Sequence, residues 1–204
     1  ICEYIEFANS LPIHAVMISP PSYFRPISDE KMIEFYRFIC QKSLHPVIAY
    51  SIPATALRVP SSVVSNSPVW GVKDSSGDIA LASEFLQDKV KVLIGTDRLL
   101  VDALKLGAAG GICGLGNLFP ARMASVYRSF AGGKIEESEE TLATVLNFTS
   151  RFLRPEFGFR ESIAAAKAVS NLINPINLGE MRLPSASYEL PEQLKSELIA
   201  LAKE

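Results

Sequence analysis

The sequence predicts an α/β fold, namely the last five β/α units of a (β/α)8 TIM barrel followed by a helical extension. Five short apolar runs alternate with helix-length stretches, which is typical of a parallel sheet whose strands are buried on both faces. Lys73 stands at the end of the third run, and barrel active sites lie at the C-terminal ends of strands. An open doubly wound sheet would also accept the five runs, but it gives no reason for this lysine.

The predicted strands are apolar runs that stop at proline, glycine or a polar residue. They are HAVMIS at 14–19, PVIAYSIP at 46–53, PVWGVK at 68–73, KVKVLIG at 89–95 and GGICG at 110–114. A barrel needs eight strands and roughly 250 residues. Because the chain has 204 residues and starts inside a helical pattern, we expect three further β/α units before residue 1.

Helices are predicted where apolar residues recur at helical spacing, and Ser28 stands where it can cap one of them. Between the strands we expect helices at 1–11, after Ser28, at 79–87, at 98–106 and at 120–131, with one or two turns in 57–66. From residue 135 the chain is predicted to be only helical, at 135–152, 159–172 and 191–203. This change divides it into a barrel part, 1–133, and a C-terminal helical extension, 134–204.

The composition argues against several classes of partner. The chain has 20 basic and 22 acidic side chains and a net charge of −2, which does not favour nucleic acid or an anionic membrane. No apolar run reaches the roughly 18 residues of a membrane span, and no signal peptide is visible. Three scattered cysteines favour a reduced, cytoplasmic protein, and two distant histidines give no metal-ligand spacing. Nucleic acid and membranes are therefore not expected as partners.

The residues at the strand tips suggest chemistry. Lys73 and Tyr50 end neighbouring strands, so they converge on the same mouth. An amine in an apolar pocket loses solvation of its charged form, which favours the neutral nucleophile, and a phenol can relay the protons that imine formation moves. Taken singly, a strand-end lysine is more often a solvent-exposed rim residue, and a tyrosine is more often a core residue.

Further polar and small residues follow the other strands. Tyr23 lies in the loop after Pro20-Pro21, while Gly95 and Asp97 follow the fourth run. The glycine-rich segment GAAGGICGLGN ends at Asn117 and lacks GxGxxG spacing. We interpret its glycines as close packing and tight turns, with a phosphate cradle as the alternative, since barrels bind phosphate in their last loops.

Together these tips resemble the dihydrodipicolinate synthase / N-acetylneuraminate lyase family of pyruvate-dependent, Schiff-base aldolases. The matching stretches are VMISPPSYFRP, VIAYSIP, GVKDSSGD, LIGTD and GAAGGICGLGN, in this order. The resemblance runs the length of the chain.

The resemblance implies roles for individual residues. The Schiff-base lysine falls on Lys73, the proton-relaying tyrosine on Tyr50, and a second tyrosine, which often reaches a neighbouring subunit's site, on Tyr23. Ile112 falls where a pocket-lining residue is expected, and we add Gly95, Asp97 and Asn117 as substrate-binding candidates. The glycine-threonine-threonine turn that binds pyruvate's carboxylate in relatives is expected before residue 1. No cofactor or metal is implied; the expected partners are pyruvate, an aldehyde and further copies of the chain in a dimer or tetramer.

The substrate is predicted from Thr55. Synthases that use aspartate semialdehyde carry arginine at this position, whereas Arg58 is three residues further on. Without that guanidinium we expect an aldolase for a 2-keto-3-deoxy sugar acid, acting on pyruvate and a glyceraldehyde-type aldehyde, with a phosphorylated aldehyde as a further possibility. Dihydrodipicolinate synthase, N-acetylneuraminate lyase and 4-hydroxy-2-oxoglutarate aldolase remain alternatives. A catalytically inactive binding module on the same fold is a further alternative, against which stand Lys73 and Tyr50 together.

Overall fold

The computed structural model describes residues 1–23, 26–153, 158–175 and 177–201. It divides into two compact units, Ile1–Gly114 and Leu115–Glu204. The predicted division at 133/134 follows strand–helix repetition rather than compactness, and it stays a prediction.

The first unit is built on a five-stranded parallel sheet in the order β1-β2-β3-β4-β5. The strands are β1 (Val16–Ile18), β2 (Val47–Ser51), β3 (Gly71–Asp74), β4 (Val92–Ile94) and β5 (Gly110–Gly111). Each pairs in parallel with the next strand along the chain. The predicted five parallel strands in chain order are therefore confirmed, although β5 ends at Gly111, three residues before the predicted end of the run, and a 3₁₀ turn begins at Gly114.

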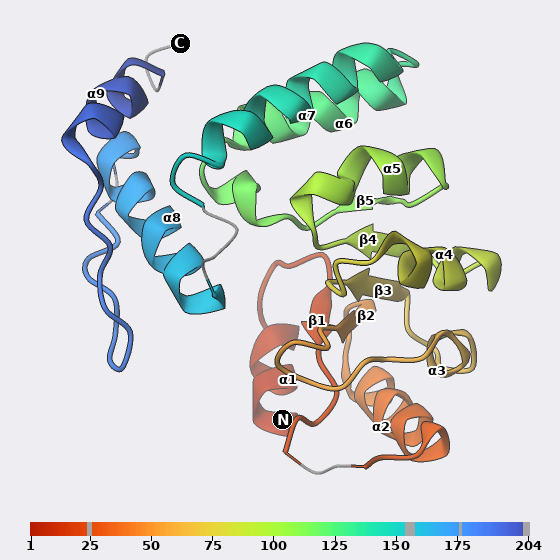
Figure 1. The fold of residues 1–204 in the computed structure, drawn as a ribbon. Helices are drawn as coiled ribbons and strands as arrows, with labels where there is room; N and C mark the ends of the chain where they lie inside the picture. Colours follow the sequence, from red (N-terminus) through yellow and green to blue (C-terminus); the bar gives the residue numbers. More distant parts are fainter. Residues whose placement is uncertain (24–25, 154–157, 176, 202–204) are drawn as a thin grey trace. The chain divides into compact units, whose positions relative to one another are not determined.

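Helices connect these strands (Figure 1). They are α1 (Cys2–Asn9), α2 (Asp29–Lys42), α3 (Ser61–Ser65), α4 (Ile79–Gln87), the 3₁₀ turn η1 (Asp97–Leu99) and α5 (Leu100–Lys105). Ser28 caps α2 as predicted, because its side chain accepts a hydrogen bond from the Lys31 amide at 3.4 Å. Since crossovers between parallel strands are right-handed as a rule and the strands add in one direction, α2 to α5 follow on one side of the sheet.

The core of the first unit lies between the sheet and these helices. Val72, Val92 and Ile94 are fully buried on the strands, and Tyr36 and Phe85 are fully buried on α2 and α4. β2 and β3 are buried along nearly their whole length, which explains their continuous apolar pattern in the sequence. The sheet therefore gives rigid support to the residues at its C-terminal tips.

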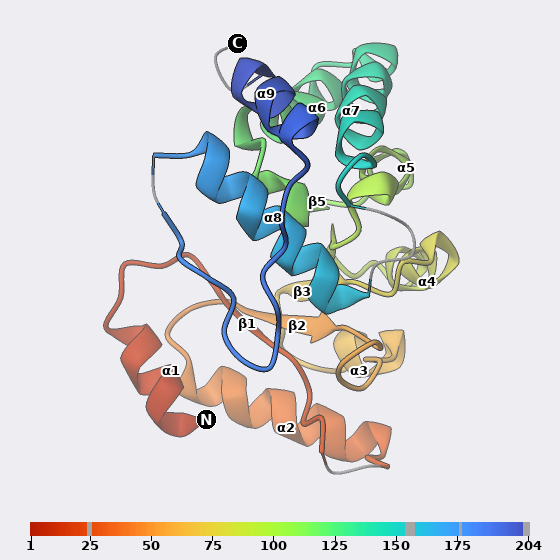
Figure 2. The same ribbon diagram turned by 60° about the vertical axis from the view of Figure 1, so that its left-hand side comes forward.

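The second unit is helical, as predicted (Figure 2). It contains the rest of η2 (Gly114–Asn117), α6 (Pro120–Ala131), α7 (Ile135–Thr149), α8 (Phe159–Ile173) and α9 (Glu192–Leu201). Gly133 adopts φ +78° in the tight turn that joins α6 to α7, and the buried Ser138 hydroxyl donates to the Val126 carbonyl at 2.7 Å. The predicted end of the last helix, residues 202–203, lies outside the described residues. No helix among the described residues has the length and hydrophobicity that a bilayer crossing requires.

Candidate active site

Lys73 lies on β3, one residue before the end of the strand. The strand was predicted to end at Lys73, but the ladder continues to Asp74, which pairs with Ser51 of β2. The predicted end is therefore wrong by one residue, because the backbone of an acidic residue can complete a ladder when its side chain finds hydrogen bonds of its own. Side chains alternate along a strand, so Lys73 and Asp74 project from opposite faces of the sheet.

Tyr50 is the nearest polar partner that the structure shows for Lys73. The two residues are register partners across β2 and β3. The Lys73 Nζ donates to the Tyr50 hydroxyl at 3.3 Å and lies 4.4 Å from the centroid of the phenol ring. Only 9% of Lys73 is exposed, which is unusual for a lysine. An amine and a phenol are thus held together in a largely water-excluded place.

Gly95, directly after β4, forms a wall beside the lysine. Its amide donates to the Asp74 carbonyl at 2.7 Å. A Cβ at this position would lie 2.9 Å from the Lys73 Cε and 2.0 Å from the Ser75 Oγ. A side chain here would displace both groups, so the sequence must place glycine at this position. Gly95 is thus brought against Lys73, while its contact with a substrate stays a prediction.

Asp97 and Ile112 follow β4 and β5 on the same edge of the sheet. The Ile112 amide donates to the Ile94 carbonyl at 2.9 Å, and its side chain is exposed. Cys113, next in the chain, donates from its Sγ to the same carbonyl at 3.5 Å. The pKa of the Cys113 thiol is raised to about 12, mainly by burial and also by the charge of Asp97, while the charge of Lys73 lowers it. Asp97 and Lys73 therefore both act electrostatically on Cys113.

Three other predicted site residues are exposed on the described chain. Tyr23 follows β1 and is 89% exposed. Thr55 is exposed in the turn after β2, where its amide donates to the Ile52 carbonyl at 3.1 Å. Asn117 lies in η2, belongs to the second unit and is exposed. Their roles in binding or catalysis stay predictions.

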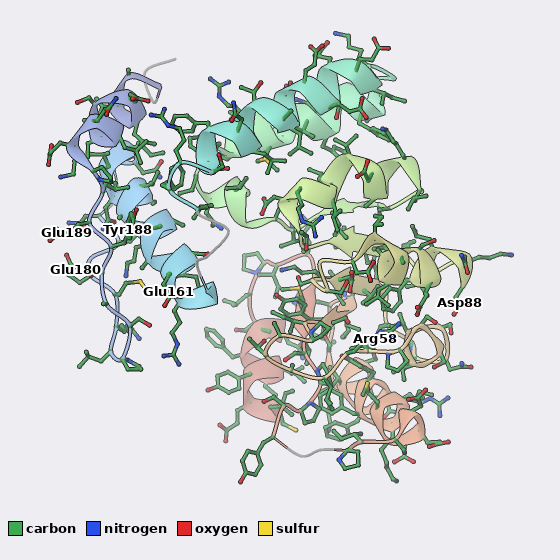
Figure 3. All side chains as sticks on the ribbon, viewed as in Figure 1. Arg58, Asp88, Glu161, Glu180, Tyr188 and Glu189 are labelled. Atoms are coloured by element: carbon green, nitrogen blue, oxygen red, sulfur yellow. The ribbon has the colours of Figure 1, made fainter. Side chains whose placement is uncertain are left out.

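Arg58 has a partner elsewhere on the first unit (Figure 3). Its guanidinium pairs with Glu84 of α4, and both side chains are partly exposed. The charge of Arg58 also lowers the pKa of Asp74, but less than burial raises it. Arg58 therefore joins the loop after β2 to α4.

Sequence reasoning missed two residues beside Lys73. Ser75 lies two positions further on and shares the Gly95 wall with the lysine. The period of two along a strand was the signal that could have found Ser75, since it places residues 73 and 75 on one face. Cys113 had no such signal, because it comes near Lys73 only when β5 is added to the sheet. Ser75 and Cys113 thus add a hydroxyl and a thiol to this end of the sheet, and both groups can hydrogen-bond to a bound molecule.

Two curated relatives cover different parts of the chain. The 4-hydroxy-tetrahydrodipicolinate synthase of Cytophaga hutchinsonii is 27% identical over 218 residues, which covers 100% of this chain and 70% of the relative. The 2-dehydro-3-deoxy-D-gluconate/2-dehydro-3-deoxy-phosphogluconate aldolase of Picrophilus torridus is 31% identical over 140 residues, which covers 65% of this chain and 52% of the relative. The chain thus spans between about half and about 70% of the length of these relatives.

A solved structure supports the fold independently. The 2-keto-3-deoxygluconate aldolase variant of Sulfolobus solfataricus superposes with a TM-score of 0.81 at 17% identity, covering 99% of this chain and 68% of that one. At this identity the likeness shows the fold alone, and it confirms the predicted partial β/α barrel with C-terminal helices. The model of the dihydrodipicolinate synthetase family matches residues 4–202. The chain therefore belongs to the dihydrodipicolinate synthetase family, a family of lyases.

Proposed function

We propose that the protein is a class I, pyruvate-dependent aldolase that forms a Schiff base on Lys73. The observation behind this proposal is the buried Lys73 amine, which lies 3.3 Å from the Tyr50 hydroxyl at the C-terminal end of a parallel sheet. A structural lysine at a strand end would reach solvent or a carboxylate. Lys73 instead points at a phenol, the type of group that imine chemistry needs for proton transfer.

The proposed reaction begins when the neutral Lys73 amine donates its electron pair to the ketone carbon of a 2-keto acid. The ketone oxygen takes up a proton, and the carbinolamine loses water to give an iminium. In cleavage, the C3–C4 bond breaks and its electron pair enters the iminium, which becomes an enamine, while the C4 hydroxyl loses its proton and becomes an aldehyde. The enamine takes up a proton at C3, and hydrolysis releases pyruvate and restores the amine.

Tyr50 is the proposed proton relay for these steps. Its hydroxyl is within hydrogen-bond distance of the nitrogen on which the carbinolamine forms and collapses. Tyr23 is the proposed second tyrosine. Because Tyr23 is exposed in the described chain, we propose that it acts in the site of a neighbouring copy within a dimer or tetramer. The proposed location of the protein is the cytoplasm. Gly95, Asp97, Ile112, Thr55 and Asn117 are the proposed substrate-binding residues.

The proposed substrate is a 2-keto-3-deoxy sugar acid, formed from or cleaved to pyruvate and a glyceraldehyde-type aldehyde. Two features support it. Thr55 offers a neutral hydroxyl, and the nearby guanidinium of Arg58 is engaged by Glu84. The Picrophilus torridus relative is named as an aldolase for such acids. The second candidate is condensation of pyruvate with aspartate semialdehyde, which is favoured by the synthase name of the Cytophaga hutchinsonii relative that covers this whole chain.

The decisive experiment is trapping with pyruvate and cyanoborohydride, performed on the whole protein. We expect one carboxyethyl group per chain, located on Lys73 by peptide mass mapping. The other lysines should be modified no faster than the lysines of the unfolded protein. Labelling spread over surface lysines, or no labelling at all, would contradict the aldolase and leave the binding module on the same fold as the better description.

A further inference from the structure

We infer that Asp74 is a positioning residue for Lys73, acting from the opposite face of β3 through the turn that its carboxylate organises. The inference rests on the proposed imine-forming role of Lys73. Asp74 is 1% exposed, and buried carboxylates occur where something specific holds them. Within the described residues, its side chain bonds to the turn between β3 and α4.

The Asp74 carboxylate holds that turn by accepting two hydrogen bonds from Ser76. The Ser76 hydroxyl donates to the Asp74 Oδ2 at 2.7 Å, and the Ser76 amide donates to the Oδ1 at 3.4 Å. The Ser76 Oγ in turn accepts the Asp78 amide at 3.2 Å, and the Asp78 Oδ1 accepts the Ala80 amide at 2.9 Å as the cap of α4. One chain of hydrogen bonds therefore runs from the last residue of β3 to the first turn of α4.

The same segment holds the lysine on its other face. The Asp74 carbonyl accepts the Gly95 amide at 2.7 Å, and the Ser75 amide donates to the Ser51 carbonyl at 2.9 Å. Ser75 and Lys73 both press against Gly95. A turn that loses its Asp74 anchor can rotate residues 74–76, and Ser75 and the Lys73 side chain would then leave the Gly95 wall. The expected consequence is an amine that is more exposed but less well aligned for pyruvate.

A second pair of register partners supports this interpretation. We call Ser51 and Asp74 the outer row and Tyr50 and Lys73 the inner row, because the two pairs project from opposite faces of β2 and β3. The Ser51 Oγ, which belongs to the register partner of Asp74, accepts the Val59 amide at 3.3 Å. Ser51 is fully buried. Both outer-row polar residues thus bond to the loop that follows their strand, while the inner row carries Tyr50 and Lys73. The outer-row side chains therefore hold the loops in place by hydrogen bonds, and the inner-row side chains are the proposed catalytic groups.

The test compares four single variants of the whole protein. Asp74→Ala removes the acceptor, Ser76→Ala removes the donor, and Asp74→Asn keeps an acceptor oxygen for Ser76. Asp88→Ala is the matched control, because this exposed aspartate lies at the other end of α4 (Figure 3). All rates are measured well below the melting temperature of every variant, so that only folded protein is compared.

Two rates are measured on Lys73 by peptide mapping. With pyruvate and cyanoborohydride, we expect Asp74→Ala and Ser76→Ala to slow trapping at least about tenfold, since small misplacements of a reacting group have large effects on rate. With formaldehyde and cyanoborohydride, we expect methylation of Lys73 relative to the exposed Lys42 to rise at least about threefold, because the amine gains solvent access. Asp74→Asn should recover most of both effects. The double variant Asp74→Ala/Ser76→Ala should lose less than the sum of the two single losses, because both substitutions remove the same bond between the two side chains.

The outcomes separate this inference from the proposed function. If unmodified protein forms no pyruvate adduct but formaldehyde labelling of Lys73 rises in Asp74→Ala, the aldolase fails and the positioning role stands. If pyruvate is trapped on Lys73 equally fast in Asp74→Ala, Ser76→Ala and Asp88→Ala, the positioning role is wrong, even when the melting temperature falls. Additive effects of the two alanine substitutions would also overturn it.

Discussion

The two faces of the β2–β3 pair differ in what their polar groups contact. On one face, Lys73 and Tyr50 contact each other, and glycine takes the place of a side chain beside them. On the other face, Ser51 and Asp74 bond to backbone and side-chain groups of the loops that follow their own strands. Hydrogen bonds within a single segment stabilise a turn, whereas a buried amine next to a phenol adds little to stability and is costly to desolvate. Polar residues that bond to their own loop, such as Ser51 and Asp74, are therefore engaged in structure, whereas Lys73 and Tyr50 are available for chemistry.

The largest expected effect is on Lys73 itself. Lys73→Arg should abolish pyruvate trapping and pyruvate-dependent turnover, because arginine stays charged and cannot form the imine. Lys91→Arg is the control, since Lys91 is exposed and lies over the Trp70 ring with its amine 5.0 Å from the centroid. Turnover is measured by pyruvate release from a 2-keto-3-deoxy sugar acid. Normal turnover in Lys73→Arg would remove the chemical role of this face.

Tyr50→Phe should have the next largest effect. The substitution keeps the ring on which the lysine lies but removes the hydroxyl 3.3 Å from its Nζ. We expect turnover to fall about 10²–10⁴-fold, the range for loss of a proton-transfer group. Tyr4→Phe, at an 80% exposed position, should leave turnover unchanged. A Tyr50→Phe enzyme with less than a threefold loss would mean that Tyr50 only packs against the lysine.

Thr55→Arg tests the proposed selection of the aldehyde. Unmodified protein, given pyruvate and equal amounts of the two aldehydes, should favour glyceraldehyde over aspartate semialdehyde by at least about tenfold. The added guanidinium should shift this ratio towards aspartate semialdehyde by one to two powers of ten, because a charge-assisted hydrogen bond contributes about 1.5–3 kcal/mol. A competition assay measures the ratio. If unmodified protein prefers aspartate semialdehyde, Thr55 does not select the aldehyde and the synthase becomes the better assignment.

The smallest effect concerns the Asp74 face and pH. Burial raises the pKa of Asp74 above its ordinary value of 3.8, and the hydrogen bonds from Ser76 oppose this only in part. A raised pKa means that the stability contributed by protonated Asp74 is complete below 3.8 and is lost as the pH rises through the folded-state pKa. Asp74→Asn stays neutral and should gain stability relative to unmodified protein over this window, by about 1.4 kcal/mol for each pH unit that the window spans.

Urea unfolding of both proteins between pH 4 and pH 7 measures this difference. Asp88→Asn is the control and should follow unmodified protein in parallel, because its side chain is exposed. If the free energies of unfolding of Asp74→Asn and unmodified protein differ by the same amount at every pH in this range, the pKa of Asp74 is not raised in the folded protein. The structural contrast between the two faces would then be weaker than the hydrogen bonds suggest.

Much of the fold and part of the candidate site could be predicted from local patterns. The five apolar runs, the helix from Ile79 to Gln87 and the cap at Ser28 follow from periodicity and side-chain hydrogen bonding within a few residues. Lys73 and Tyr50 could be paired because consecutive parallel strands place their tips together. These signals depend on neighbours in sequence or in strand order.

The surroundings of Lys73 could not be predicted in this way, because they depend on which groups approach one another across the sheet. Gly95 meets Lys73 and Ser75, and Cys113 reaches the same edge, because β4 and β5 are added beside β3. The one-residue extension of β3 through Asp74 required the Ser76 hydrogen bonds, which compensate for burial of a carboxylate in a strand. Local periodicity therefore predicts the order of strands and helices and identifies the amine, because it depends only on residues that are near one another in the chain. The enclosure of that amine and the opposite roles of residues 73 and 74 were decided by packing, because burial and close approach are properties of the assembled sheet.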